Sequence, residues 1–396
     1  MSKSEQQEPK SKIMREEIIK KTKAYYCLDC GKCTAVCPIA NVRNGYSPRR
    51  LVTLTVNRSD DYVLQDTGLW SCLTCRRCQD ICPSDVDYVE FTKLLRFEAK
   101  KIGEEGKCSH GGALHSLMKI MTATELNQDR NGWITSDFKT SKDGEYLYFV
   151  GCLPYFDTFF SDIKAGSLDI SRSTLKILNL LGIEPQVMPN ERCCGHDLLW
   201  TGDFENFKKL AQHNLNEIKK TGAKKIITSC PECFMTLKLD YPDLLGKVDY
   251  EVMHISEFLA ERLPQIKIKG LDKKVTFQDP CRLGRFMNIY EAPRKIMNSI
   301  KGVEFKEMRR SGAKAICCGT VGWINCDAYS KKIQTERLKE AKSTGAEILV
   351  TACPKCQIHF KCAQSGSEKE KEKEKEELKI EIIDLTTLLA LAIGGE

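Results

Sequence analysis

The sequence predicts a multi-domain α+β protein, with a helical head followed by two repeated α/β units that carry small parallel sheets. Two observations predict this class. Eight cysteines fall in two tight groups between residues 27 and 82, and helical stretches such as residues 86–101 are expected beside them. From residue 152 onward, single and paired cysteines recur at matched intervals, and short β-rich runs alternate with helix-like segments. We expect a mobile tail over residues 1–20, the head over 21–143, and the two copies over 144–270 and 271–396.

Each copy is predicted to pair its strands in parallel. The text TGAKKIITSCPEC of the first copy returns as TGAEILVTACPKC in the second, and a helical pattern precedes both. Strand, helix and strand with a crossover form a parallel sheet, whose ligand crevice lies beyond the carboxyl ends of the strands. Residues 250–263 and 380–393 are expected to close each copy with a strand and a helix. The other predicted strands end just before a cysteine, at residues 146–150, 225–228, 275–277 and 348–351.

Helix signals are clear over residues 203–222. Asp203 suits the N-cap, and Gly222 suits the C-terminal end after two lysines. Residues 327–345 repeat this arrangement in the second copy. The apolar stripe of the first helix is Phe204, Phe207, Ala211, Leu215 and Ile218.

The cysteine content indicates the class of chemistry. The chain has 21 cysteines and begins with a polar segment rather than a secretory signal, so metal binding is favoured over disulfides. The formal net charge of +7 would suit nucleic acid, but two four-iron clusters with four thiolates each remove about four units. We therefore expect no nucleic-acid binding. No apolar run reaches the roughly 20 residues of a membrane span, so we predict a cytoplasmic protein without a span of its own.

The head carries the pattern C-x2-C-x2-C-x3-C-P twice. Three thiolates at two-residue gaps hold one cluster, and the fourth cysteine, before a proline, reaches the other cluster in two-cluster ferredoxins. The head is thus predicted to be a helical two-cluster ferredoxin-like domain with two [4Fe–4S] cubane clusters. Zinc, which prefers two separated C-x2-C pairs, is the disfavoured alternative. One predicted set is Cys27, Cys30, Cys33 and Cys82, and the other is Cys72, Cys75, Cys78 and Cys37.

Each copy contributes five further cysteines: one upstream, a vicinal pair before glycine, and a C-P-x-C. Adjacent cysteines do not easily chelate one metal, but they can bind different irons of one cluster. Two matched pairs make a vicinal disulfide a poor alternative. Five thiolates exceed what a cubane or a single zinc needs, which predicts a larger or open cluster in each copy. The sets are Cys152, Cys193, Cys194, Cys230 and Cys233, and then Cys281, Cys317, Cys318, Cys353 and Cys356.

Several nearby features are assigned structural roles. His196, directly after the first CCG, is expected to pack, with cluster orientation or proton donation as the alternative. Trp70 and Trp323 are expected to pack rather than relay electrons. The charged run over residues 367–377 is predicted to be a solvated loop or a frayed helix end. Idle or buried thiols, with spare ligands as the alternative, are predicted for Cys108, Cys326 and Cys362.

These motifs resemble the heterodisulfide reductase family. The head, CLDCGKCTAVCP and GLWSCLTCRRCQDICP, resembles the C subunit of that enzyme, and the two CCG units resemble its B subunit. Their fusion in this order is similar to the D subunit of the membrane-linked enzyme and its relatives. Those relatives include the iron–sulfur subunits of anaerobic glycerol-3-phosphate dehydrogenase and glycolate oxidase. The resemblance covers about residues 22–392.

The resemblance implies that the two cubanes pass electrons to two noncubane [4Fe–4S] clusters, one in each CCG domain. The two sets of five cysteines would hold them as catalytic ligands, with zinc in one set as the minor alternative. A heterodisulfide such as CoM-S-S-CoB, or a related disulfide, would enter between them and be reductively cleaved or formed. This catalytic iron–sulfur protein would work in a hetero-oligomer with a flavoprotein or b-type cytochrome, in a complex that could lie at the cytoplasmic face of a membrane.

Alternatives stay open at this point. Relatives with the same architecture link a flavoprotein dehydrogenase of the glycolate, lactate or glycerol-3-phosphate type to a membrane quinone or phenazine pool. A zinc-ribbon module that binds nucleic acid is the third candidate. No G-x-G-x-x-G follows a predicted strand, so flavin or nicotinamide chemistry is expected from a partner.

The sequence also departs from the family pattern at two places. Arg282 follows the cysteine of DPCRLGR, where the family often has histidine, and CCGTVGWIN lacks the usual glycine run. Arg282 and Arg285 could meet a sulfonate or phosphate, but structural pairing is the expected role.

Overall fold

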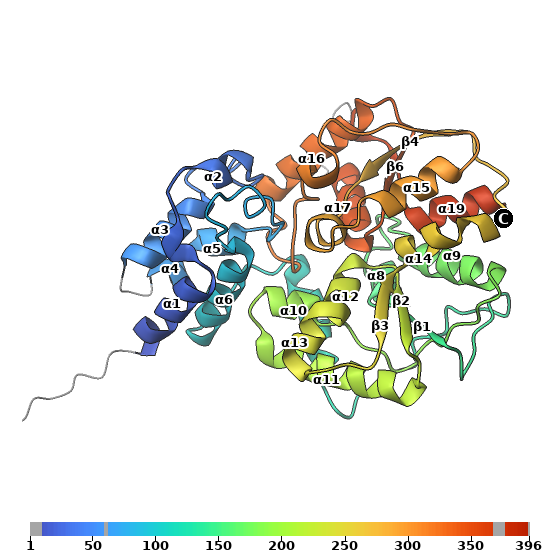
Figure 1. The fold of residues 1–396 in the computed structure, drawn as a ribbon, viewed down its shortest axis with the longest axis horizontal. Helices are drawn as coiled ribbons and strands as arrows, with labels where there is room; N and C mark the ends of the chain where they lie inside the picture. The colour runs from blue at the N-terminus through green and yellow to red at the C-terminus, as the bar shows by residue number, and fades with distance from the viewer. Residues whose placement is uncertain (1–9, 59–61, 367–376, 395–396) are drawn as a thin grey trace, which may run out of the picture.

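The computed structural model describes residues 10–58, 62–366 and 377–394. Figure 1 shows a helical head, in blue, beside two units that each contain a sheet, one green to yellow and the other orange to red. The predicted fold class is confirmed: a helical N-terminal part is followed by two α/β units with small parallel sheets. Of two predicted segments, residues 1–9 of the tail and 367–376 of the charged run lie outside the described residues.

The head is built from short helices. Its longest helix after the tail, α6 (Tyr88–Lys101), matches the segment predicted as helical, and the Asp87 side chain caps it by accepting a hydrogen bond from Glu90 N at 2.9 Å. The remaining elements are α1 (Lys10–Lys21), η1 (Ala24–Tyr26), α2 (Lys32–Val36), α3 (Pro48–Asn57), α4 (Tyr62–Gln65), α5 (Thr67–Ser71), η2 (His110–Gly112) and α7 (Ala113–Ile120).

The first copy contains a three-stranded parallel sheet in the order β1-β2-β3. In its register, Lys225 lies opposite Tyr146 on one side and Glu251 on the other. The strands are β1 (Tyr146–Phe149), β2 (Lys225–Thr228) and β3 (Glu251–His254). The helices are α8 (Leu153–Phe159), α9 (Ser167–Leu180), α10 (His196–Trp200), α11 (Phe204–Thr221), α12 (Pro231–Met235), η3 (Thr236–Asp240), α13 (Tyr241–Leu245), α14 (Ile255–Arg262) and η4 (Leu263–Gln265).

The second copy has a four-stranded parallel sheet in the order β5-β4-β6-β7. Its strands are β4 (Lys273–Gln278), β5 (Val303–Phe305), β6 (Ile348–Thr351) and β7 (Glu381–Asp384). The edge strand β5 was not predicted, because its three residues are too few for a periodic pattern and none is fully buried. The helices are η5 (Arg282–Phe286), α15 (Glu291–Ser299), η6 (Gly312–Lys314), α16 (Ala328–Lys342), α17 (Pro354–Ser365) and α19 (Leu385–Ile393).

The predicted helix signals are confirmed. Asp203 caps α11 through its side chain, and Gly222 ends the helix in the left-handed conformation with φ 67°. Asp327 caps α16 by accepting hydrogen bonds from Tyr329 N and Ser330 N, both at 2.9 Å. Both helices therefore begin where their capping aspartates predicted.

The sheets position the cysteines. Helices α9, α14, α15 and α19 pack against one another between the two sheets (Figure 1), and central strand residues such as Leu147, Ile226 and Leu349 are fully buried. The carboxyl ends of four strands lead directly into cysteine-bearing loops. Among the described residues, no helix is both long and apolar enough to cross a membrane.

Candidate functional site

The structure brings the inner predicted head set together. Cys37, Cys72, Cys75 and Cys78 line one cavity of about 330 Å³, walled by Tyr46 and Tyr88 among others. All four cysteines are buried, and Thr74 N donates to the Cys72 sulfur at 3.3 Å. Burial raises the pKa of the Cys78 thiol well above its usual value. An iron centre or another thiophile would have to offset that cost on binding.

The outer predicted head set lies nearer the surface. Cys30 is exposed, whereas Cys27, Cys33 and Cys82 are half-buried. Two links hold the segments around Cys27 and Cys82 side by side: Asp87 N donates to Thr22 O at 2.9 Å, and the Lys23 ammonium pairs with Asp85 at 2.5 Å. The set therefore forms the solvent-facing end of the head.

The first set of five cysteines converges beyond β1 and β2. The sulfurs of Cys194 and Cys233 are 3.5 Å apart, and Cys152 hydrogen-bonds with Cys193. Gly151 approaches so closely that a Cβ there would lie 2.9 Å from the Cys233 sulfur. The arrangement is a cradle of thiols in which only glycine fits at this point.

A buried carboxylate supports the loop before Cys152. Glu191 is fully buried and accepts hydrogen bonds from Val150 N at 3.1 Å and from Gly151 N at 2.6 Å. Burial raises the pKa of Glu191 to about 7, against the opposing charge of Arg130. The carboxylate thus orients the strand end that carries the first cysteine.

The second set of five converges beyond β4 and β6. Cys281, Cys318, Cys353 and Cys356 line a cavity of about 350 Å³, and Cys317 hydrogen-bonds with Cys281 and Cys318. The Cys318 sulfur also lies 3.4 Å from His359 Nδ1. Glu232 and Pro231 of the first copy line the same cavity, so this site lies where the two copies meet.

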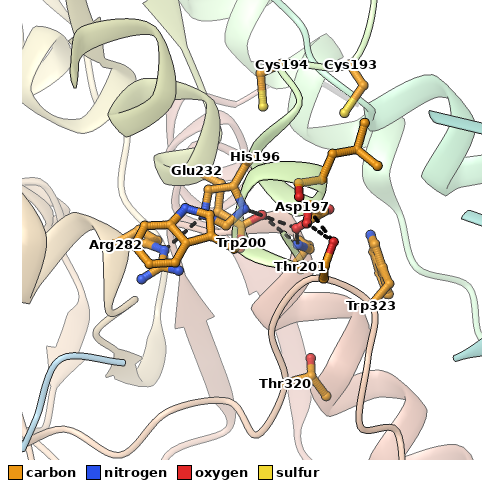
Figure 2. A network of polar contacts seen from close by, with 12 residues as sticks. Cys193, Cys194, His196, Asp197, Trp200, Thr201, Glu232, Arg282, Thr320 and Trp323 are labelled. Atoms are coloured by element: carbon orange, nitrogen blue, oxygen red, sulfur yellow. Dashed lines mark hydrogen bonds and ion pairs between the residues drawn. The ribbon is translucent and has the colours of Figure 1, made fainter. Parts of the chain in front are cut away.

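A network of charged side chains joins the two copies between the cysteine sets (Figure 2). Lys355 pairs with Glu232 at 2.7 Å and also with Asp197. His196 Nδ1 lies 3.1 Å from Asp197, and Arg282 Nε donates to His196 Nε2 at 3.0 Å. Because Nε2 accepts, the hydrogen of His196 is on Nδ1 and is donated to Asp197.

The network is almost wholly removed from water. Lys355 is 3% exposed and His196 is 1% exposed. Burial disfavours the ammonium of Lys355, but Asp197 and Glu232 hold its pKa well above the usual value. In turn, burial opposes the charge of Asp197, yet Lys355 and His196 lower its pKa below the usual value. Both partners are therefore charged at neutral pH.

Sequence reasoning missed Asp197, Glu232 and Lys355. Glu232 and Lys355 occupy the same position in the repeated C-P-x-C motifs, so opposite charges at equivalent sites were the available signal. His196, Asp197 and Glu232 could also offer a metal-like ligand set. The ammonium of Lys355 already pairs with both carboxylates there, which leaves this position to an ion pair.

The expected structural pairing of Arg282 and Arg285 is confirmed. Arg282 donates to Thr74 O at 2.7 Å and to Thr74 Oγ1 at 2.8 Å, and its guanidinium lies 4.2 Å from the Trp200 ring centroid. Arg285 donates to Cys75 O at 2.6 Å and to Ala315 O at 2.8 Å. The two arginines face protein groups of the head and of their own copy.

The packing roles of the two tryptophans are also confirmed. Trp323 stacks on Phe160 and contacts His359 edge-on, and Trp70 lies under the guanidinium of Arg96. Cys108 is half-buried, whereas Cys326 is exposed and shares a small cavity with Cys362. No contact of these three thiols with the predicted cysteine sets is found among the described residues, and their idle role stays a prediction.

The donor chemistry of these sites fits iron–sulfur clusters. Each site offers four or five thiols, and the described side chains around them leave cavities bordered by sulfur rather than by carboxylate or imidazole groups alone. Thiolates select iron–sulfur clusters and zinc over hard cations. The Gly151 cradle adds a close approach that a single four-coordinate ion would not need.

Comparisons with known families agree with this division of the chain. Residues 23–86 match the family described as 4Fe-4S dicluster domain. Residues 146–238 and 275–361 each match the family described as cysteine-rich domain (CCG). The matches cover the head motifs and most of both copies.

Curated relatives are iron–sulfur oxidoreductase components. Over 277 residues the chain is 34% identical to the D subunit of the dihydromethanophenazine:CoB–CoM heterodisulfide reductase of Methanosarcina acetivorans, across 67% of this chain and 63% of that protein. It is 30% identical over 228 residues to the EtfAB:quinone oxidoreductase of Syntrophomonas wolfei, across 54% of this chain and 30% of that protein. The matched region thus spans less than two thirds of either relative.

A solved structure shares the fold. The crystal structure of a hypothetical protein from Helicobacter pylori matches with a TM-score of 0.57 at 11% identity, covering 96% of this chain and 77% of that one. At this identity the similarity concerns the fold alone.

Proposed function

Because the chain belongs to the iron–sulfur proteins that are like the D subunit of heterodisulfide reductase, with a dicluster head and two CCG domains, we propose that it reductively cleaves or forms a disulfide between its two CCG cysteine sets. The head sets would hold two cubane clusters, and the CCG sets would hold two noncubane clusters. Bound there, the clusters supply single-electron transfer and iron sites that bind sulfur. A redox partner protein completes a hetero-oligomer.

One observation carries the proposal. Ten cysteines from distant parts of the chain converge as two sets beyond the carboxyl ends of two duplicated sheets, where open α/β sheets bind their ligands. The two sets also lie close together, since Cys353 is influenced by the charges of both Cys230 and Glu232. A disulfide has two sulfurs and takes up two electrons on cleavage, so a paired site suits this substrate class.

The chain's own residues would perform three tasks there. The apolar and charged walls keep water away from the thiols, as the burial of nearly all ten cysteines indicates. Glu191 holds the backbone before Cys152, and the Lys355 network fixes the two copies relative to each other. Arg282 and Arg285 attach the head loop to the second copy.

Substitution of the vicinal cysteines tests the proposal. We expect Cys193→Ala or Cys317→Ala to remove one noncubane EPR signal and its iron, and to lower disulfide reduction at least about 100-fold, because each change deletes a central thiolate ligand. The cubane signals should persist, since the head sets lie in a separate domain. Cys326→Ala, at an exposed cysteine, is the matched control.

The proposal is wrong if anaerobically prepared protein contains iron for only two clusters, or if its duplicated half holds zinc alone. Loss of the cubane signals together with the noncubane signal would instead contradict the independence of the head. A disulfide that produces no change in the EPR spectrum of iron-replete protein would be excluded as a substrate.

Electron transfer without a disulfide substrate is the second candidate. The similarity to an EtfAB:quinone oxidoreductase favours it, and the chain would then connect a flavoprotein dehydrogenase with a membrane quinone or phenazine pool. Protein that reduces a quinone analogue from a flavoprotein donor, while no disulfide is turned over, would support this candidate over the first.

A further inference from the structure

The inner head set lies against the second copy. Its loop of residues 72–78 is held by two arginines of η5, the helix that follows Cys281. Arg282 donates to Thr74 at 2.7 and 2.8 Å, and Arg285 Nε donates to Cys75 O at 2.6 Å. In return, Arg76 donates to Arg285 O at 3.0 Å. The ligand loops of the two predicted sites are thus bonded directly to each other.

Arg285 bridges these two sets. Its Nη1 donates to Ala315 O at 2.8 Å, and Ala315 lies two residues before Cys317. The side chain is 6% exposed. Burial opposes its charge, but thiolates at Cys75, Cys281 and Cys317 raise its pKa. One guanidinium therefore lies among cysteines of both the head and the second copy.

The head reaches the first copy by a longer path. Arg96 donates to Cys72 O at 2.7 Å and to Trp200 O at 3.0 Å, and Trp200 is six residues beyond Cys194. The first set instead meets the second set, because Cys230 lies near enough to Cys353 for its charge to act there. The contacts therefore run from head to second copy and from second copy to first.

Resting on the proposed function, we propose that Arg282 and Arg285 make the second CCG set the one that exchanges electrons with the head, and that the first set is reached only through the second. Each transfer moves one electron, so the inner head site is oxidised by one electron as the second CCG site is reduced by one. Two cationic side chains beside Cys281 also favour the more negative, reduced form of that site.

Matched cysteine variants test this order. In full-length, iron-replete protein, Cys193→Ala impairs the first set and Cys317→Ala impairs the equivalent position of the second. The protein is reduced with methyl viologen radical, a one-electron donor, and the remaining noncubane signal is followed by freeze-quench EPR. We expect the second site to be reduced at the wild-type rate in Cys193→Ala. In Cys317→Ala the first site should be reduced at least about 100-fold more slowly.

Equal rates in the two variants, or slower reduction in Cys193→Ala, would overturn the inference and leave the proposed function intact. Wild-type protein with only two iron centres would overturn both. Cubane EPR signals of full intensity in each variant show that the head has folded.

Arg285 is tested as a positioning residue by two substitutions. Arg285→Gln should slow reduction of the second site at least about tenfold at unchanged iron content, because the bridge between Cys75 O and Ala315 O is lost. Arg285→Lys should recover part of the rate, since it keeps the charge. Arg309→Gln, at an exposed arginine of the same copy, is the control. Slower reduction that follows only from lost iron would contradict the assignment.

Discussion

At the scale of single residues, the two C-P-x-C motifs differ in one informative way. Glu232 and Lys355 stand at equivalent positions of the repeat, carry opposite charges and pair at 2.7 Å in the buried boundary between the copies. Burying two charges is costly unless both are paired and hydrogen-bonded. Asp197 and His196 supply those additional partners. Two copies of one domain thereby gain a complementary contact that identical copies would lack.

Lys355→Met should lower the free energy of unfolding by about 3–5 kcal/mol, because it leaves Asp197 and Glu232 as unpaired buried carboxylates. Urea denaturation measures the effect. Lys220→Met is the control: that side chain is 71% exposed in its pair with Glu217, and its loss should cost less than about 1 kcal/mol. Equal costs for the two variants would show that the Lys355 pair is not desolvated.

At the scale of elements, the same corner closes both copies but is capped differently. His254 ends β3 and accepts from Ser256 N at 3.2 Å, whereas Asp384 ends β7 and accepts from Thr386 N at 2.8 Å. Both caps are buried. Burial lowers the pKa of His254 to about 3 and raises the pKa of Asp384 to about 7. Each side chain is therefore held in its neutral form over part of the ordinary pH range.

Opposite pH dependences should follow from these caps. Between about pH 4 and 7 the folded chain keeps the proton of Asp384 that the unfolded chain releases, so its contribution to stability falls as pH rises. Below about pH 6.5 the unfolded chain protonates His254 while the folded chain does not, so stability falls as pH falls. Each pH unit inside either window is worth about 1.4 kcal/mol.

Urea denaturation of Asp384→Asn and His254→Asn across pH 4–8 measures both effects, because asparagine keeps an acceptor for the cap without titrating. Relative to wild type, Asp384→Asn should gain stability as pH rises, and His254→Asn should gain stability as pH falls. Parallel stability curves for either variant and wild type would show that the cap titrates alike in the folded and unfolded states.

At the scale of the whole molecule, a few buried arginines attach the head to the two copies. Arg96 is fully buried and donates to Leu69 O, Cys72 O and Trp200 O at 3.0, 2.7 and 3.0 Å, so one guanidinium joins α5, the inner cysteine loop and α10. Gly202 packs so tightly against α6 that a Cβ would lie 2.5 Å from Arg96 O. The head and the first copy therefore share one packed boundary.

Arg96→Gln should lower the free energy of unfolding by about 3–5 kcal/mol, because several buried carbonyl oxygens lose their donor. Hydrogen exchange should accelerate in α5 and α10, the two elements that Arg96 joins. Arg172→Gln, whose side chain is 43% exposed, is the control. Unchanged exchange in both helices would show that the boundary is held by apolar packing instead.

Local chemistry explains what could be predicted along the chain. Caps such as Asp203 and Asp327, the alternating patterns of the strands and the internal repeat act over a few neighbouring residues, so they predicted the helices, the parallel sheets and the fold class. The short edge strand β5 escaped, because its pairing with β4 depends on tertiary context. Cysteine spacing likewise predicted the four sets, whose ligation remains a prediction.

The sequence by itself determined the elements, their duplication and the kinds of side chain available for metal binding, because these depend on order along the chain. Only the tertiary structure decided which cysteine loop meets which, and which charges become buried partners. Lys355 and Asp197 are 158 residues apart in sequence, and Arg285 and Cys75 are 210 apart. Contacts over such separations arise when three domains pack into one core, and the free energy of burying a charge depends on the partners found there.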